Sequence, residues 1–160
     1  MRLSTVIASV FGIGYFRIAP GTVMSAAAMP PAFLIALYGG GAALLAASIA
    51  VFVIGIYACG DHVRATGRED PSECVIDELA GQWLACAFAV MPIGAASGVI
   101  SLPALALAFV FFRLFDIWKP WPVSWADQKL EGGLGVMADD MLAGLMAGLV
   151  VTLIRVMVPL

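Results

Sequence analysis

Residues 42–59, AALLAASIAVFVIGIYAC, form a continuous run without a charged side chain. The run is rich in Ala and Leu and does not alternate between polar and apolar residues, which favours a helix over a strand of a membrane barrel. Its length is close to the roughly 20 residues that a helix needs to cross a bilayer. This stretch therefore predicts an apolar helix that can enter a membrane.

Other apolar stretches accompany this run: 23–38, 79–91 with a continuation to 100, 102–115 and 141–158. Several are shorter than about 20 residues, which tilting or local thinning of the bilayer can accommodate. The N-terminal segment 1–16 lacks a small-x-small cleavage site and is interpreted as an interfacial or partly buried helix rather than a signal peptide. The sequence thus predicts one domain, 1–160, that is all-α and polytopic, with about five apolar helices plus an N-terminal interfacial helix.

The composition agrees with a membrane protein. Hydrophobic residues make up 62% of the chain, charged residues 12%, and the mean hydropathy is +1.03, whereas about a quarter of the residues of a soluble domain are charged. The net charge is −3, with only eight Lys and Arg, which argues against nucleic acid as a partner. Cys59, Cys74 and Cys86 follow no metal-ligand spacing and are interpreted as small buried hydrophobic residues.

The charges are distributed unevenly between the two predicted sides of the membrane. If each stretch crosses once, the turns 39–41 and 92–101 carry no charge, whereas 61–78 and 113–140 share the opposite side, and only Arg155 is left near the uncharged one. The positive-inside rule then places the charged side in the cytoplasm. It carries these cationic residues: Arg17, Arg64, Arg68, Arg113, Lys119 and Lys129.

Two acidic pairs and one further aspartate lie at helix ends on this charged side. Asp77 and Glu78 precede the third stretch, Asp116 follows the fourth, and Asp139 and Asp140 precede the fifth. Helix packing would bring these carboxylates together, and their repulsion would require a cation. Carboxylate oxygens suit Mg²⁺ or Mn²⁺, which also bind substrate phosphate. The alternative is that Asp77 and Asp139 cap helices and complement the helix dipole.

Two features predict contacts with phosphate. Gly21 and Thr22, in the segment Ala19-Pro20-Gly21-Thr22, could offer backbone N–H groups and an N-cap hydroxyl to an anion, although a plain turn is an equal alternative. Arg113, Asp116 and Lys119 recur at helical spacing and would share one face.

Trp118, Trp121 and Trp125 flank Lys119 as an interfacial aromatic belt, so its ammonium could reach a lipid headgroup. The alternative is a surface ion pair and a lysine that extends to water.

Several phosphatase mechanisms are excluded by the residues present. The chain has no Cys-x5-Arg spacing, since Cys59 and Arg64 are one residue too close, which excludes a cysteinyl-phosphate route. His62 is its single histidine, which excludes mechanisms that need two histidines. The chain also lacks an Asp-x-Asp nucleophile motif. Metal-assisted attack by water remains.

Four blocks along the chain resemble the phosphatidylglycerophosphatase A family. They are Gly12-Ile13-Gly14 with Ala19-Pro20-Gly21-Thr22, Val75-Ile76-Asp77-Glu78-Leu79-Ala80-Gly81, Phe112-Arg113-Leu114-Phe115-Asp116-Ile117-Trp118-Lys119-Pro120-Trp121-Pro122, and Gly132-Gly133-Leu134-Gly135-Val136-Met137-Ala138-Asp139-Asp140-Met141-Leu142-Ala143-Gly144. The resemblance implies an all-helical, Mg²⁺-dependent enzyme of the bacterial inner membrane that converts phosphatidylglycerophosphate to phosphatidylglycerol and phosphate. Met24 departs from the glycine expected before Ser25.

These inferences give a set of predicted site residues. The catalytic residues are Asp77, Glu78, Asp116, Lys119, Asp139 and Asp140; Gly21, Thr22, Arg113 and Lys119 bind substrate; and Asp77, Glu78, Asp139 and Asp140 bind Mg²⁺. The partners are a phospholipid substrate and the membrane, in a multi-pass arrangement with the active site on the cytoplasmic face.

Two other functions are alternatives to this one. A small cation channel or transporter would need ionisable groups near mid-membrane or on both faces. A CDP-alcohol phosphotransferase would carry a long Asp-x-x-Asp-Gly-x-x-Ala-Arg signature, which is absent.

Overall fold

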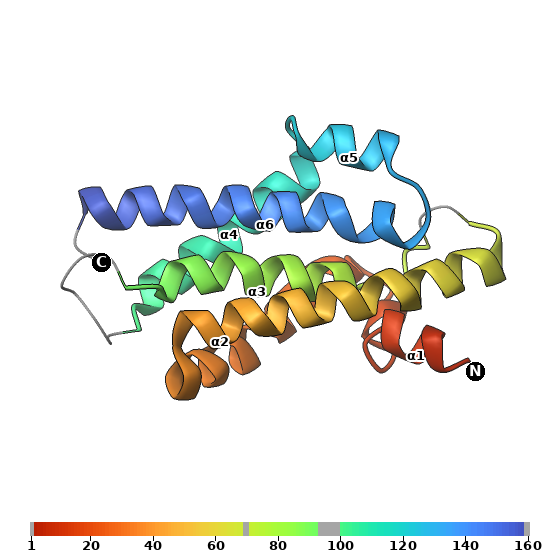
Figure 1. Cartoon of the computed structure of the whole chain (residues 1–160), viewed down its shortest axis with the longest axis horizontal. Helices are drawn as coiled ribbons and strands as arrows, with labels where there is room; N and C mark the ends of the chain where they lie inside the picture. Colours follow the sequence, from red (N-terminus) through yellow and green to blue (C-terminus); the bar gives the residue numbers. More distant parts are fainter. Residues whose placement is uncertain (1, 69–70, 93–99, 159–160) are drawn as a thin grey trace.

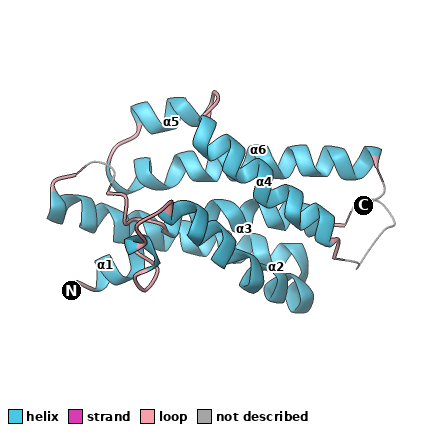
Figure 2. Ribbon diagram, turned by 180° about the vertical axis from the view of Figure 1, so that it is seen from behind, coloured by secondary structure: helices cyan, strands magenta, loops and turns pink. Residues whose placement is uncertain are grey.

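The computed structural model describes residues 2–68, 71–92 and 100–158, and this part of the chain is all-helical, without a strand (Figures 1 and 2). Most of the helices lie roughly along one long axis, and the short α5 lies outside the others (Figure 1). The elements are α1 (Leu3–Ala8), η1 (Ile13–Tyr15), α2 (Pro20–Thr66), α3 (Ile76–Val90), α4 (Leu102–Trp118), α5 (Val123–Lys129) and α6 (Gly132–Met157).

The longest helix, α2, consists of two arms that meet at Gly40. Gly40 has φ 69° and ψ −173°, which is not helical, and glycine reaches this conformation without a steric penalty. We call residues 20–39 the first arm and residues 41–66 the second arm. Figure 1 shows the chain turning back at this point.

Both arms pack against α3, in opposite directions. In the first arm, the carbonyl of Ala28 accepts a hydrogen bond of 3.0 Å from the indole N–H of Trp83. In the second arm, the hydroxyl of Ser48 donates to the carbonyl of Ala80 at 2.8 Å. The two arms and α3 therefore form three adjacent helical segments.

The predicted number of membrane-spanning helices was too high. Two described helices, α2 and α6, are long and apolar enough to cross a membrane, rather than about five. The reason is that α3 has 15 residues and α4 has 17. The predicted stretches 23–38 and 42–59 lie in the two arms of α2, which is counted here as one helix. Only 28% and 33% of the most apolar windows of α2 and α6 are buried within the protein.

Small residues bring α3 and α6 into close contact. A Cβ on Gly144 would lie 2.9 Å from the backbone carbon of Gly81, and one on Gly148 would lie 2.7 Å from the Phe88 ring. The small-xxx-small spacing in α6 thus serves close packing, as the sequence predicted.

The charged groups gather at one end of the structure. That end, on the right of Figure 1, contains the starts of α2, α3 and α6 and the end of α4. At the opposite end, the Arg155 guanidinium donates to the carbonyls of Phe88 and Met91, at 3.2 and 2.9 Å. Among the described residues, Arg155 is therefore the charged residue that lies apart from the charged end.

The N-terminal segment forms a short helix that is attached to the charged end. The Ser4 hydroxyl donates to the Asp61 carboxylate at 2.5 Å, and the Thr5 hydroxyl lies 3.1 Å from Nδ1 of His62. The predicted N-terminal helix is thus only six residues long, and its polar side chains contact the end of α2.

Candidate active site

A cavity of about 480 Å³ opens at the charged end. Seven of its lining residues carry a carboxylate and one, Lys119, carries an ammonium group, so the cavity is strongly acidic. The lining residues are Pro20, Val63, Ser72, Cys74, Asp77, Glu78, Asp116, Lys119, Asp127, Leu130, Glu131, Gly132, Gly135, Val136, Asp139 and Asp140.

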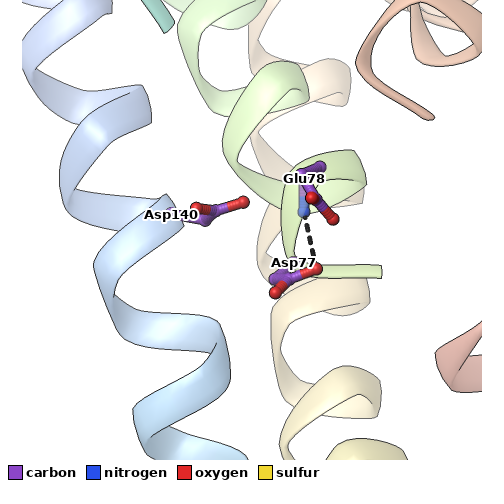
Figure 3. Close-up of side chains that lie close together, drawn as sticks. All are labelled: Asp77, Glu78 and Asp140. Carbon is purple, nitrogen blue, oxygen red and sulfur yellow. Dashed lines mark hydrogen bonds between the residues drawn. The ribbon is translucent and has the colours of Figure 1, made fainter. Parts of the chain in front are cut away.

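Three of these carboxylates form a compact cluster. Oxygens of Asp77, Glu78 and Asp140 lie within 4.8 Å of one another. Asp77 and Glu78 occupy the first turn of α3, where the Asp77 carboxylate accepts the backbone N–H of Glu78 at 3.0 Å. Asp140 points across from α6 (Figure 3). The two predicted acidic pairs are therefore brought together, with one residue of the second pair in the cluster.

Several oxygens at this site are buried without a hydrogen-bond partner. They are Oε2 of Glu78, Oδ2 of Asp140 and Oδ1 of Asp139. A buried carboxylate oxygen without a partner is costly, and clustered carboxylates repel one another. Hard oxygen donors of this kind fit a Mg²⁺-sized cation.

Asp139 lies beside the cluster rather than in it. Its carboxylate accepts a hydrogen bond of 2.8 Å from the Lys119 ammonium group. The alternative role of Asp139 as a helix cap is wrong, because α6 begins at Gly132 with Glu131 at the N-cap position. Asp139 therefore lies two turns inside the helix, at the cavity wall.

Gly21 lets the first arm of α2 approach the carboxylate cluster. A Cβ at this position would collide with the Glu78 carboxylate and would lie 3.4 Å from the Arg113 guanidinium. The Gly21 carbonyl also accepts the hydroxyl of Ser25 at 2.9 Å. Gly21 is thus essential for packing, and it does not line the cavity.

Thr22 does not have the predicted N-cap position. The helix begins at Pro20, with Ala19 as the N-cap residue in a left-handed conformation (φ 46°), so Thr22 is the third helical residue. Pro20 lines the cavity, whereas Thr22 does not.

Arg113 and Asp116 share one face of α4, as their spacing predicted. They form an ion pair, and the Arg113 guanidinium also donates to the Ser25 hydroxyl at 3.4 Å. Asp116 lines the cavity but Arg113 does not. Arg113 is therefore placed to hold Asp116 in position.

Lys119 lies at the C-cap of α4 and reaches into the cavity. Its ammonium group donates to Asp127 as well as to Asp139. Burial alone would lower the pKa of Lys119, but the hydrogen bonds to Asp127 and Asp139 outweigh it and raise the pKa. Because an ammonium group has three donors, one remains for a ligand.

Sequence reasoning missed Asp127, Glu131 and Ser25. Asp127 and Glu131 lie in the same charged segment as Lys119, so the rarity of charge in this chain could have identified them. Ser25 had no such signal, because its role depends on the packing of α2 against α4.

A second polar cluster, formed by His62, Arg68 and Glu73, lies next to Cys74 in the cavity wall. The Glu73 carboxylate pairs with Arg68 and lies 3.0 Å from Nε2 of His62. Burial opposes ionisation of Glu73, yet the hydrogen bonds with His62 and Arg68 hold its pKa below the usual value. Cys59, Cys74 and Cys86 are free and buried, as the sequence predicted.

The fold and site define an all-helical protein with a buried carboxylate centre at one end. Residues 6–155 match the sequence profile of the phosphatidylglycerophosphatase A family. The chain belongs to this family, and it is accordingly a phosphatase.

Individual relatives cover most of the chain. Phosphatidylglycerophosphatase A of Escherichia coli is 33% identical over 142 residues, 86% of this chain and 74% of that protein. Phosphatidylglycerophosphatase A of Haemophilus influenzae is 35% identical over 146 residues, 91% of this chain and 84% of that protein. A Bacteroides thetaiotaomicron protein whose name proposes phosphatidylinositol-3-phosphatase activity is 32% identical over 166 residues, covering 96% of this chain and 94% of its own. No solved structure gave a significant match.

Proposed function

We propose that the protein is a Mg²⁺-dependent phosphatase that hydrolyses the terminal phosphomonoester of phosphatidylglycerophosphate to phosphatidylglycerol and phosphate. Family membership supports the reaction. The observation that carries the metal dependence is the cluster of Asp77, Glu78 and Asp140. An anionic phosphate would be repelled by so acidic a cavity unless cations neutralised it.

The cluster is the proposed metal site, with Asp139 as an adjacent or water-mediated ligand. The unpartnered oxygens of Glu78, Asp139 and Asp140 support this assignment. Bound there, Mg²⁺ would stabilise negative charge on the phosphoryl oxygens and increase the acidity of a bound water.

Two other side chains complete the proposed chemistry. Lys119 would bind a phosphoryl oxygen through the ammonium hydrogen that Asp127 and Asp139 leave free. Asp116, held by Arg113 at the cavity wall, would orient the attacking water. The water oxygen bonds to phosphorus, the bond from phosphorus to the glycerol oxygen breaks, and the glycerol oxygen takes up the proton that the attacking water releases.

We further propose that the charged end lies at the cytoplasmic surface of the bacterial inner membrane and that the helical segments enter the bilayer. The mostly unburied apolar surface of α2 and α6 supports this placement. Trp118, Trp121 and Trp125 are 70%, 78% and 50% exposed at the charged end, where an aromatic belt would meet the headgroups. A cation channel is not favoured, because the described charges gather at one end.

The test is phosphate release by the purified protein in mixed micelles containing phosphatidylglycerophosphate. We expect EDTA to abolish release, Mg²⁺ to restore it, and phosphatidylinositol 3-phosphate to react more slowly. Full activity in EDTA would remove the metal from the mechanism. A preference for phosphatidylinositol 3-phosphate would show that phosphatidylglycerophosphate is not the preferred substrate.

A further inference from the structure

A second hollow, of about 540 Å³, lies between the first arm of α2 and α4. No charged side chain lines it. Its residues are Ala26, Met29, Pro30, Phe33 and Leu34 from α2 and Leu102, Leu105 and Ala106 from α4. We call this hollow the apolar groove.

The α4 wall of the apolar groove is continuous with the cavity. Leu102, Ala106, Phe109, Arg113 and Asp116 follow one another at alternating spacings of four and three residues, which places them on one face of the helix. Leu102 and Ala106 line the groove, and Asp116 lines the cavity. One face of α4 therefore leads from the groove to the carboxylates.

The first arm of α2 also runs from the cavity to the groove, although Pro20 lies on a different face from the groove residues. Pro20 lines the cavity, and Ala26 and Pro30 line the groove. Thr22 precedes Ala26 by four residues, as Ala26 precedes Pro30, so the three share a face. Thr22 is partly buried and lies between the two hollows along the helix.

The length of this path matches a lipid. With a rise of about 1.5 Å per residue, Ala26 lies about 9 Å along the helix from Pro20, and Leu34 about 21 Å. One leaflet contributes about 15 Å to a hydrocarbon core of about 30 Å. A groove at this depth would lie beside the acyl chains of a lipid whose headgroup is in the cavity.

We propose that the apolar groove binds an acyl chain of the substrate while the cavity binds its phosphomonoester. This proposal rests on the proposed function and adds a second recognition element to it. It places Thr22 beside the glycerol backbone of the lipid rather than at the phosphate. The enzyme would therefore select long-chain lipid phosphates over phosphate esters with short chains.

Filling the groove tests the proposal. We expect Ala26→Phe and Ala106→Phe to lower kcat/KM for dioleoyl phosphatidylglycerophosphate at least tenfold. The value for the dibutyryl analogue, whose chains are too short to reach the groove, should stay within twofold. Ala27→Phe is the matched control, because Ala27 is exposed on the same helix and does not line the groove. It should leave both substrates unaffected.

Photo-crosslinking of the wild-type protein gives an independent readout if a filled groove impairs folding. A phosphatidylglycerophosphate analogue with a diazirine at mid-chain should label groove residues such as Phe33 and Leu105, and unlabelled substrate should compete. Unlabelled phosphatidylcholine with the same acyl chains should not reduce the labelling of these residues.

The possible outcomes separate this proposal from the proposed function. If the wild-type protein hydrolyses neither lipid, the proposed function fails. If it hydrolyses both and the groove variants affect them equally or not at all, the groove proposal alone fails. If phosphatidylcholine displaces the label as well as unlabelled phosphatidylglycerophosphate does, bulk lipid fills the groove. If groove residues crosslink to a second copy of the chain, that copy fills the groove. Either result would overturn the proposal.

Discussion

Gly81 of α3 lies directly against the backbone of Asp140 in α6. A Cβ on Gly81 would come within 2.5 Å of the Asp140 carbonyl oxygen. Gly144, one turn further along α6, packs against the same glycine. This contact sets the separation between α3 and α6, and hence the separation of Asp77 and Glu78 from the Asp140 side chain.

Gly81→Ala is expected to destabilise the protein and impair the site. Overpacking of this kind costs about 1–3 kcal/mol, and any separation of the helices would also spread the carboxylates. We expect a lower thermal midpoint in detergent and a weaker dependence of activity on Mg²⁺. Gly60→Ala is the control, since its Cβ would meet Gly133 only at 3.5 Å, an ordinary contact. Equal stability of Gly81→Ala and Gly60→Ala would contradict the packing argument.

Removing a charge from the cluster of Asp77, Glu78 and Asp140 should lower the activity of the protein without lowering its stability. Asp77→Asn and Asp140→Asn are expected to lower kcat by about 100-fold or more, because loss of a metal ligand removes several kcal/mol of transition-state stabilisation. Without Mg²⁺ the same variants should be at least as stable as the wild-type protein, because each removes a charge from a repulsive cluster. Calorimetry with and without Mg²⁺ measures both effects.

Asp61→Asn is the control for these variants, since Asp61 lies outside the cavity and contacts Ser4. In calorimetry, Mg²⁺ should still stabilise Asp61→Asn, whereas it should no longer stabilise Asp77→Asn or Asp140→Asn. Unchanged stabilisation by Mg²⁺ in Asp140→Asn would place the metal elsewhere.

The sequence was sufficient to predict the helices and the end of the structure where charge gathers. Long uncharged runs determine the helices, and the grouping of charged segments between them determines the charged end. The same reasoning predicted that Asp77, Glu78 and Asp140 lie close together, because carboxylates are rare in such an apolar chain. The i,i+3 relation of Arg113 and Asp116 followed from helical spacing alone.

Contacts between distant segments could not be predicted in this way. The expectation of about five spans counted α3 and α4 as crossings, although they have only 15 and 17 residues. Lys119 is the C-cap residue of α4 in a left-handed conformation (φ 49°), so it lies just beyond the helical spacing that placed it with Arg113. Its partner Asp127 comes from α5, whose position depends on tertiary packing.

The Glu73 cluster should give the protein a pH-dependent contribution to stability. Because the pKa of Glu73 is lowered by folding, its contribution is present above the unfolded value of about 4.3 and is lost as the pH falls through the folded value. The thermal midpoint of Glu73→Gln should therefore lie below that of the wild-type protein at pH 6, and the difference should shrink below about pH 4. Glu131→Gln, at the exposed cavity rim, is the control. A difference that does not change with pH would contradict the ion-pair argument.

The proposed orientation can be tested by cysteine labelling in intact cells, on a background from which Cys59, Cys74 and Cys86 have been removed. A probe at Ser72, at the charged end, should be protected from a membrane-impermeant thiol reagent. A probe at Tyr38, which is 86% exposed beside the turn at the opposite end, should react. Permeabilised cells provide the control, since both positions should then be labelled. The reverse pattern in intact cells would invert the orientation.

Lys119 and Arg113 should have different kinetic roles. Lys119 lines the cavity and has a free donor, so Lys119→Met should raise KM for the substrate and weaken inhibition by phosphate, each by about tenfold or more, as expected for loss of a charge-assisted contact. Arg113 does not line the cavity but pairs with Asp116, which does, so Arg113→Met should mainly lower kcat, and Arg113→Lys should restore part of it. Both variants should keep their stabilisation by Mg²⁺, which serves as the control for an intact metal site. If Lys119→Met behaves like the wild-type protein while Arg113→Met loses inhibition by phosphate, the phosphate contact belongs to Arg113 and the headgroup lies deeper than the cavity wall.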